Sequence, residues 1–205
     1  ALDLLLPVIT AVAAAHEEGA RTTAHCFGEQ SLHDFAAAGT DCIEHATGLD
    51  EESTRAFAAQ GITIVPTLVN VANFPDLAEP ARDKYPTYHR HMLDLHARRY
   101  ATIAQAFEAG IPIRTGTDAG GALAHGLIAR EALELERAGL PRTAVLAAAT
   151  WEAREWLGRP GIEEGDPADL VVYPADPRAD LQVLGDPAAI ILRGNRIRGG
   201  RRPAP

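Results

Sequence analysis

Apolar and polar positions follow two alternating periods along residues 1–157. Short, nearly continuous apolar runs predict buried strands, and each is followed by a stretch with helical spacing that usually ends at glycine. Strands that alternate with helices favour an α/β fold with a parallel sheet covered on both faces. The predicted strands cover residues 21–25, 41–45, 62–69 and 113–117. The predicted helices cover residues 5–18, 31–38, 50–60, 88–109, 123–138 and 141–157.

Two segments depart from this alternation. Residues 70–86 are rich in proline and predict a loop. Beyond Leu157, residues 158–165 are rich in turn formers, and 168–173 and 190–198 predict strands without helices between them, with Gly194-Asn195 as a two-residue hairpin turn. We therefore predict two domains, residues 1–157 and a small β-domain in residues 158–205.

Composition describes an ordinary globular chain, with 46% hydrophobic and 23% charged residues. Its 205 residues and four strand–helix units are few for a complete barrel, which typically needs about 250 residues. A net charge of -9 argues against nucleic acid as a partner. No apolar run approaches the roughly 20 residues of a membrane helix, so no membrane partner is predicted either.

Cys26 and Cys42, the two cysteines of the chain, are too few for a disulfide framework and favour a reduced, cytoplasmic setting. Each lies on a predicted buried strand. Period-two alternation makes Cys26 point away from His25, and Cys42 away from His45. Neither thiol is therefore predicted to share the face that carries those histidines.

Three metal-competent side chains end predicted strands, namely His25, His45 and Asp118. The carboxyl ends of parallel strands meet at one edge, so these side chains should converge there. Singly, each has another explanation, since a buried histidine can be a core residue and an aspartate can cap a helix. Together they favour a site that is, or descends from, a metal site. Zn²⁺ suits such ligands best, and Fe, Mn and Co also suit them.

Several motifs in chain order resemble the amidohydrolase superfamily, in its imidazolonepropionase-like and prolidase-like branch. The motifs are His25-Cys26-Phe27-Gly28, Ala38-Gly39-Thr40-Asp41-Cys42-Ile43-Glu44-His45, Leu49-Asp50, Val65-Pro66-Thr67-Leu68 and Gly116-Thr117-Asp118-Ala119-Gly120. Thr150 and residues 161–172 resemble the family's return from barrel to β-sandwich. The resemblance implies the C-terminal half of a TIM-like (β/α)8 barrel, strands 5–8, followed by part of a small β-sandwich domain.

The resemblance also implies roles for the three residues. His25 would be the metal ligand that ends barrel strand 5, and His45 the ligand that ends strand 6. Asp118 would be both ligand and catalytic proton shuttle at strand 8, accepting a proton from metal-activated water and donating it to the leaving nitrogen. Glu44 precedes His45, points the other way on alternation, and is predicted to be a structural partner.

The family's paired histidines on strand 1 and its metal-bridging lysine on strand 4 have no counterpart here. The only lysine is Lys84, in the loop after the third predicted strand. His89-Arg90-His91 matches the His-x-His pattern of the family's paired ligands, but it begins a predicted helix, where side chains two positions apart point in different directions. It predicts a solvated helix or a lid. His125, near the predicted mouth, fits either an exposed helix start or a substrate contact.

Two hypotheses follow. The first is a metal-dependent hydrolase of carbon–nitrogen bonds in a small substrate, such as an acylated amino acid, a dipeptide or a cyclic amide. Its partner would be a complementary N-terminal barrel half, from the same gene or a separate chain, or a second copy in a homo-oligomer. The second is a non-catalytic half-barrel that binds or assembles without turnover, because open sheet edges recruit partners.

Overall fold

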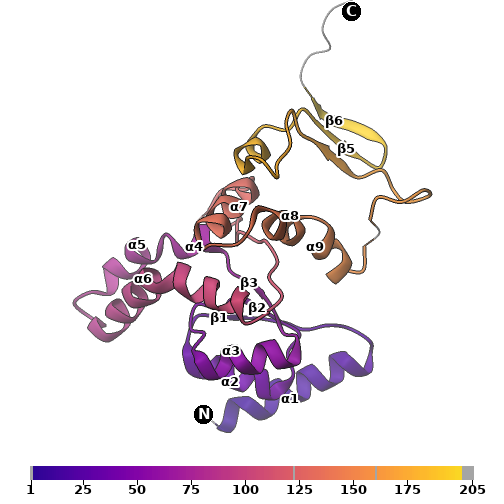
Figure 1. Cartoon of the computed structure of the whole chain (residues 1–205). Helices are drawn as coiled ribbons and strands as arrows, with labels where there is room; N and C mark the ends of the chain where they lie inside the picture. The colour runs from indigo at the N-terminus through magenta and orange to yellow at the C-terminus, as the bar shows by residue number, and fades with distance from the viewer. Residues whose placement is uncertain (1, 122, 160, 200–205) are drawn as a thin grey trace, which may run out of the picture.

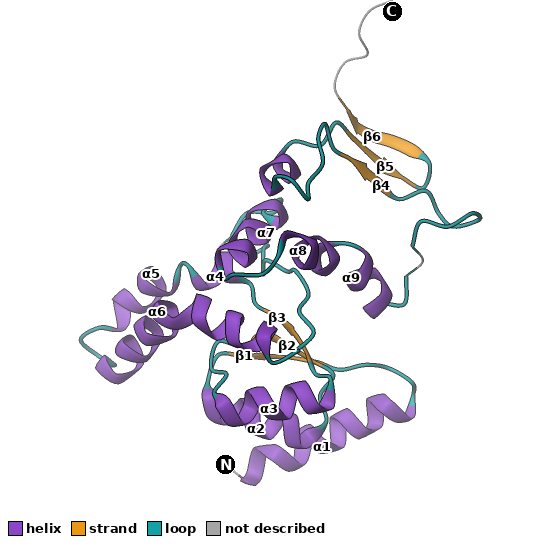
Figure 2. Cartoon of the chain, in the orientation of Figure 1, coloured by secondary structure: helices purple, strands orange, loops and turns teal. Residues whose placement is uncertain are grey.

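The computed structural model describes residues 2–121, 123–159 and 161–199 (Figure 1). Its first sheet confirms the predicted parallel arrangement, with three strands side by side in chain order and a helix before each. The strands are β1 (Thr23–Cys26), β2 (Cys42–His45) and β3 (Thr63–Val65). The preceding helices are α1 (Leu2–Glu17), α2 (Glu29–Ala38) and α3 (Glu51–Gln60). These three helices gather on one side of the sheet (Figure 2).

The main hydrophobic core includes the face of this sheet that its helices cover. Leu32 of α2 and Phe57 of α3 pack into one cluster with Ile43 and Ile64 of the strands, and all four are completely buried. We predicted that helices cover both faces of the sheet. This is wrong for β1, because Thr23 and His25, which share one face of that strand, are exposed. The helices therefore leave a polar face of β1 open.

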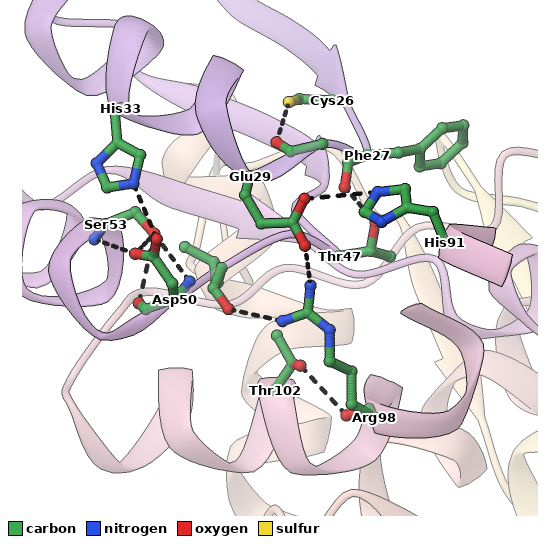
Figure 3. Close-up of polar contacts among 12 residues, drawn as sticks. Cys26, Phe27, Glu29, His33, Thr47, Asp50, Ser53, His91, Arg98 and Thr102 are labelled. Carbon is green, nitrogen blue, oxygen red and sulfur yellow. Dashed lines mark hydrogen bonds and ion pairs between the residues drawn. The ribbon is translucent and has the colours of Figure 1, made fainter. Parts of the chain in front are cut away.

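Asp50 starts α3 with a reciprocal capping box (Figure 3). Its carboxylate accepts from the Ser53 amide at 2.8 Å, and the Asp50 amide donates to the Ser53 hydroxyl at 3.0 Å. These bonds satisfy amides that have no partner inside the helix. The Ser53 amide is also the main reason why the pKa of Asp50 falls to about 2.

We expect Asp50→Ala to lower the free energy of unfolding by about 1 kcal/mol near pH 7. Because the pKa of Asp50 is lowered on folding, its charge stabilises the fold above pH 3.8, and this contribution is lost as the pH falls toward 2. Denaturant unfolding of wild type and variant between pH 7 and pH 2 measures both effects. Asp50→Asn is the matched control, since asparagine caps equally well but does not titrate. A stability difference between wild type and the Asp50→Ala variant that stays constant down to pH 2 would contradict the assignment.

The chain after β3 differs most from the predicted pattern. The third strand ends at Val65, four residues before its predicted end at Val69, and helices replace the predicted loop over residues 70–86. They are α4 (Leu68–Val71), α5 (Phe74–Ala78) and the 3-10 helix η1 (Glu79–Ala81). Periodicity does not distinguish a short buried apolar helix from a strand. Pro75 and Pro80 lie in the first turns of α5 and η1, where a missing amide is tolerated.

The predicted fourth strand is reduced to a single parallel bridge between Ile64 and Ile113. The Arg114 amide donates to the Ile64 carbonyl at 2.9 Å, but the next amide, from Thr115, already donates to Ala148. Gly116 then passes so close to β3 that a Cβ there would lie 2.4 Å from a Val65 methyl carbon. The segment leading to Asp118 therefore follows the sheet only briefly.

Four further helices complete the first part of the chain. They are α6 (Pro86–Glu108), α7 (Ile128–Arg137), α8 (Arg142–Ala149) and α9 (Trp151–Trp156). α7 begins five residues later than predicted, after a loop in which Gly126 has φ 94°. The helix predicted over 141–157 breaks at Thr150, with φ -134° and ψ -96°. In the described parts of the chain, no helix combines the length and apolar character needed to cross a membrane.

The C-terminal segment forms a second, antiparallel sheet in the order β4-β5-β6. Its elements are β4 (Leu170–Val172), the 3-10 helix η2 (Leu181–Gly185), β5 (Ala189–Leu192) and β6 (Asn195–Gly199). The hairpin turn is Arg193-Gly194, with φ 49° and 78°, one residue earlier than predicted. Leu181 is completely buried in the main core. The division into residues 1–157 and 158–205 stays a prediction.

Candidate metal centre

Two of the predicted ligands meet at the carboxyl end of the first sheet. Nδ1 of His25 lies 2.9 Å from Nε2 of His45. The strand register alone does not bring them together, because His25 is paired with Glu44, and His45 with Cys26. His45 reaches its neighbour because its φ of 71° is left-handed, which turns the side chain out of the strand alternation.

This departure corrects two predictions about the faces of β2. The register aligns Thr23 with Cys42 and His25 with Glu44, so Cys42 and Glu44 lie on the His25 face. The prediction that neither thiol shares the ligand face is wrong for Cys42, although Cys26 does pack into the opposite core. Burial raises the pKa of Cys42 to about 12, so the thiol is neutral.

Glu44 shares the face of His25 and is not directed away from the site as predicted. Its carboxylate accepts from the Thr23 hydroxyl at 3.3 Å. Burial raises the pKa of Glu44, and the negative charge of Asp118 raises it further. Glu44 is therefore close enough to Asp118 for the charges of the two carboxylates to oppose each other.

His45 is held from several directions. It is 2% exposed, and its Nδ1 lies 2.6 Å from the Thr67 hydroxyl. The Phe27 ring lies 4.5 Å from both imidazole centroids. Burial, followed by the nearby His25, lowers the pKa of His45 to about 4. The imidazole is therefore neutral near pH 7, which is the form that binds metals.

Asp118 lies beside this pair without joining it. Its side chain is exposed, and Oδ2 accepts from the Asn70 amide nitrogen Nδ2 at 2.8 Å. The charge of Asp118 acts on His45, since it raises the pKa of that imidazole against the effect of burial. Within residues 2–121, 123–159 and 161–199, no three His, Cys, Asp or Glu side chains gather closely enough to hold a metal ion.

Backbone strain is concentrated at the same place. Among the described residues, non-glycine residues with positive φ are His45, Ala46, Thr67, Asp118 and Arg193. All but Arg193 lie where the chain leaves a strand or bridge of the first sheet. Such conformations cost on the order of 1–3 kcal/mol each and persist only where the surroundings hold them, often at functional sites.

The other histidines singled out in the sequence lie elsewhere. Nε2 of His91 lies 3.5 Å from Oε2 of Glu29 on α2 (Figure 3). Nε2 of His89 lies 3.5 Å from Oε2 of Glu79 instead, so the two rings diverge as helical spacing requires. His125 is exposed in the loop before α7, with its ring against Gly120.

Three residues that support the site were not predicted from the sequence. Thr67 and Asn70 lie in the turn after β3 and contact His45 and Asp118 respectively. Glu131 on α7 binds the same turn. Its only sequence signal is an acidic side chain on the buried face of an amphipathic helix.

A model of the amidohydrolase family matches residues 8–197 of the chain. The chain belongs to the amidohydrolase family. The match confirms the resemblance noted in the sequence motifs. The similar solved structures described below support its prolidase-like branch.

Relatives of this amidohydrolase chain occur in Mycobacterium tuberculosis and Mycobacterium bovis. Each is an uncharacterized protein 48% identical over 184 residues, which are 90% of this chain and 50% of the relative. A solved Xaa-Pro dipeptidase with bound methionine is similar with a TM-score of 0.82 and 27% identity, over 94% of this chain and 48% of that chain. A solved Bifidobacterium longum protein assigned as a prolidase is similar with a TM-score of 0.82 and 28% identity, over 97% of this chain and 52% of that chain. The chain thus spans about half the length of these proteins.

Proposed function

We propose that this chain supplies part of the active site of a metal-dependent hydrolase that cleaves carbon–nitrogen bonds. The observation that carries the proposal is the neutral, buried His45 directed at His25 with 2.9 Å between their nitrogens. The substrate class is a small acylated amino acid, dipeptide or cyclic amide. The similar structures named as a dipeptidase and a prolidase support this class.

The histidine pair fits a divalent metal. Two bonds of about 2.0–2.1 Å to one Zn²⁺ can span the 2.9 Å between His25 Nδ1 and His45 Nε2. The Thr67 hydroxyl on the other nitrogen of His45 is the kind of outer partner that fixes a ligand's orientation. Asp118 is the proposed third ligand. When bound, such a metal lowers the pKa of water and polarises a substrate carbonyl.

The chain's own residues account for the proton transfers. Asp118 is exposed, so its carboxylate can accept a proton from the attacking water and donate it to the leaving nitrogen. Asn70 holds Oδ2 of this carboxylate and leaves Oδ1 for the transfer. Neutral His45 adds no positive charge that would oppose cation binding.

We further infer that the first sheet and the segment before Asp118 are strands 5–8 of a (β/α)8 barrel, and that residues 158–205 form part of a β-sandwich. In the described residues no strand pairs with the outer edge of β1, which supports a complementary barrel half as partner. The alternative of a non-catalytic half-barrel is less well supported, because the site retains a neutral, buried His45 directed at His25.

Metal analysis combined with hydrolysis assays tests the function. The panel consists of Xaa-Pro dipeptides, N-acyl amino acids and a cyclic amide, assayed with the barrel complete. We expect a chelator to abolish hydrolysis and Zn²⁺ to restore it, and His25→Ala to lose metal. His33→Ala is the matched control, because His33 binds Asp50 on the surface. Hydrolysis that persists without bound metal would contradict the proposal.

A further inference from the structure

Glu131 is a completely buried carboxylate on α7, far in sequence from His25 and His45. Its Oε1 accepts from the Leu68 amide at 2.7 Å, and its Oε2 accepts from the Val69 amide at 2.8 Å. Both amides belong to the first turn of α4, where no carbonyl of the helix is available to them. Glu131 therefore binds the start of α4 with both oxygens.

This contact replaces an ordinary helix cap. Thr67 is the N-cap residue of α4, and a threonine there normally accepts a bond from its own helix. In this structure the Thr67 side chain makes no capping bond, and its hydroxyl lies 2.6 Å from Nδ1 of His45 instead. Because Glu131 satisfies the amides, Thr67 is free to hold His45.

The turn that Glu131 binds carries two links to the site. Thr67 contacts His45 at its beginning, and Asn70 Nδ2 donates to Asp118 at 2.8 Å three residues later. Thr67 also has φ 49°, an outlier for a β-branched residue, which must be held by its surroundings. Within the described residues, no other element forms side-chain hydrogen bonds to both His45 and Asp118.

We propose that Glu131 is a positioning residue for His45 and Asp118, acting through the turn of residues 67–70. The proposal rests on the proposed function for its catalytic consequence, but not for the contacts. A buried carboxylate is unfavourable, and burial raises the pKa of Glu131 to about 7, with Glu134 adding repulsion. Packing alone would be served by an apolar side chain. The hydrogen bonds that the carboxylate accepts from the Leu68 and Val69 amides explain why an acidic residue occupies this position.

The test is Glu131→Gln, with Glu134→Gln as the matched control. Glu134 lies one turn along the same helix and is also buried, but it binds Tyr100 and Arg137 rather than the turn. We expect Glu131→Gln to speed amide hydrogen exchange at Leu68 and Val69 by about tenfold or more, because an amide group cannot accept both bonds. The ¹⁵N signals of the His45 imidazole should shift as the Thr67 contact loosens.

In the metal-loaded protein, Glu131→Gln should weaken metal binding by about 10- to 100-fold, as is typical when a residue that orients a metal ligand is changed. It should also lower kcat. Glu134→Gln should leave exchange at residues 68–69, the His45 signals and metal affinity unchanged. Unchanged His45 signals in Glu131→Gln, or equal effects of both variants, would overturn the proposal.

Two further measurements keep the outcome decisive if Glu131→Gln does not fold. Glu131→Asp keeps the charge but shortens the reach, and should give the same changes in smaller size. In the wild-type protein, Leu68 and Val69 amides that exchange as fast as an exposed loop would overturn the proposal without any variant. A wild-type protein that binds no metal contradicts the proposed function, whereas the exchange and imidazole measurements still decide the role of Glu131.

Discussion

With the barrel complete, we expect Asp118→Asn to lower kcat by about 10²- to 10⁴-fold, the range typical for loss of a general base or acid. Asparagine keeps the shape of the side chain and can still meet the Asn70 amide through its oxygen, but it cannot accept the proton of the attacking water. The histidine pair remains intact in this variant. Metal content should therefore fall much less than kcat, and the two are measured on the same preparation.

Asp76→Asn is the control, because Asp76 is exposed on α5 and has no described contact with the site. It should hydrolyse at the wild-type rate. Retention of the wild-type kcat by Asp118→Asn would remove Asp118 from the proton transfers. A loss of metal in proportion to the loss of kcat would leave it a ligand without the second role.

Only His45 ends its strand as predicted, because β1 continues to Cys26 and the segment before Asp118 forms a single bridge. The order of strands and helices nevertheless placed His25 and His45 at one edge of the sheet. That inference works because parallel strands share an edge, and it needs only the order of strands and helices. It could not predict how His45 reaches His25. Strict alternation assigns the faces of β2 wrongly for Cys42 and Glu44, since a single left-handed residue at the strand end reverses the direction of the side chain.

The supporting contacts were beyond sequence reasoning for a different reason. Glu131 and Leu68 are separated by 63 positions, and the sequence around either residue does not indicate a contact with the other. The apolar run that includes Leu68 and Val69 is compatible with a strand or with a buried helix, and the strained Thr67 decides between them. Unpredicted features thus coincide with strain at the site, where local preference and global structure conflict.

The largest effect is expected from the complementary barrel half. β1 pairs only with β2, and β3 makes only β2 pairs and the bridge to Ile113, within the described residues. Thr23 and His25 on β1 are exposed, and β1 contains no aspartate, glutamate, lysine or arginine that would deter pairing. We expect residues 1–205 alone to self-associate and to show no hydrolysis, because a second copy adds His25, His45 and Asp118 again without new kinds of ligand.

Mixing the chain with a polypeptide that carries barrel strands 1–4 should give a stable complex and bring hydrolysis from undetectable to measurable. Light scattering follows the assembly, and the panel of amide substrates follows the activity. The His25→Ala chain is the control: it should assemble equally well and remain inactive, which separates completion of the sheet from completion of the site. A stable monomer whose cooperative unfolding is independent of protein concentration would contradict the argument from open edges. So would hydrolysis by that monomer, since its site would then need no ligand from outside these residues.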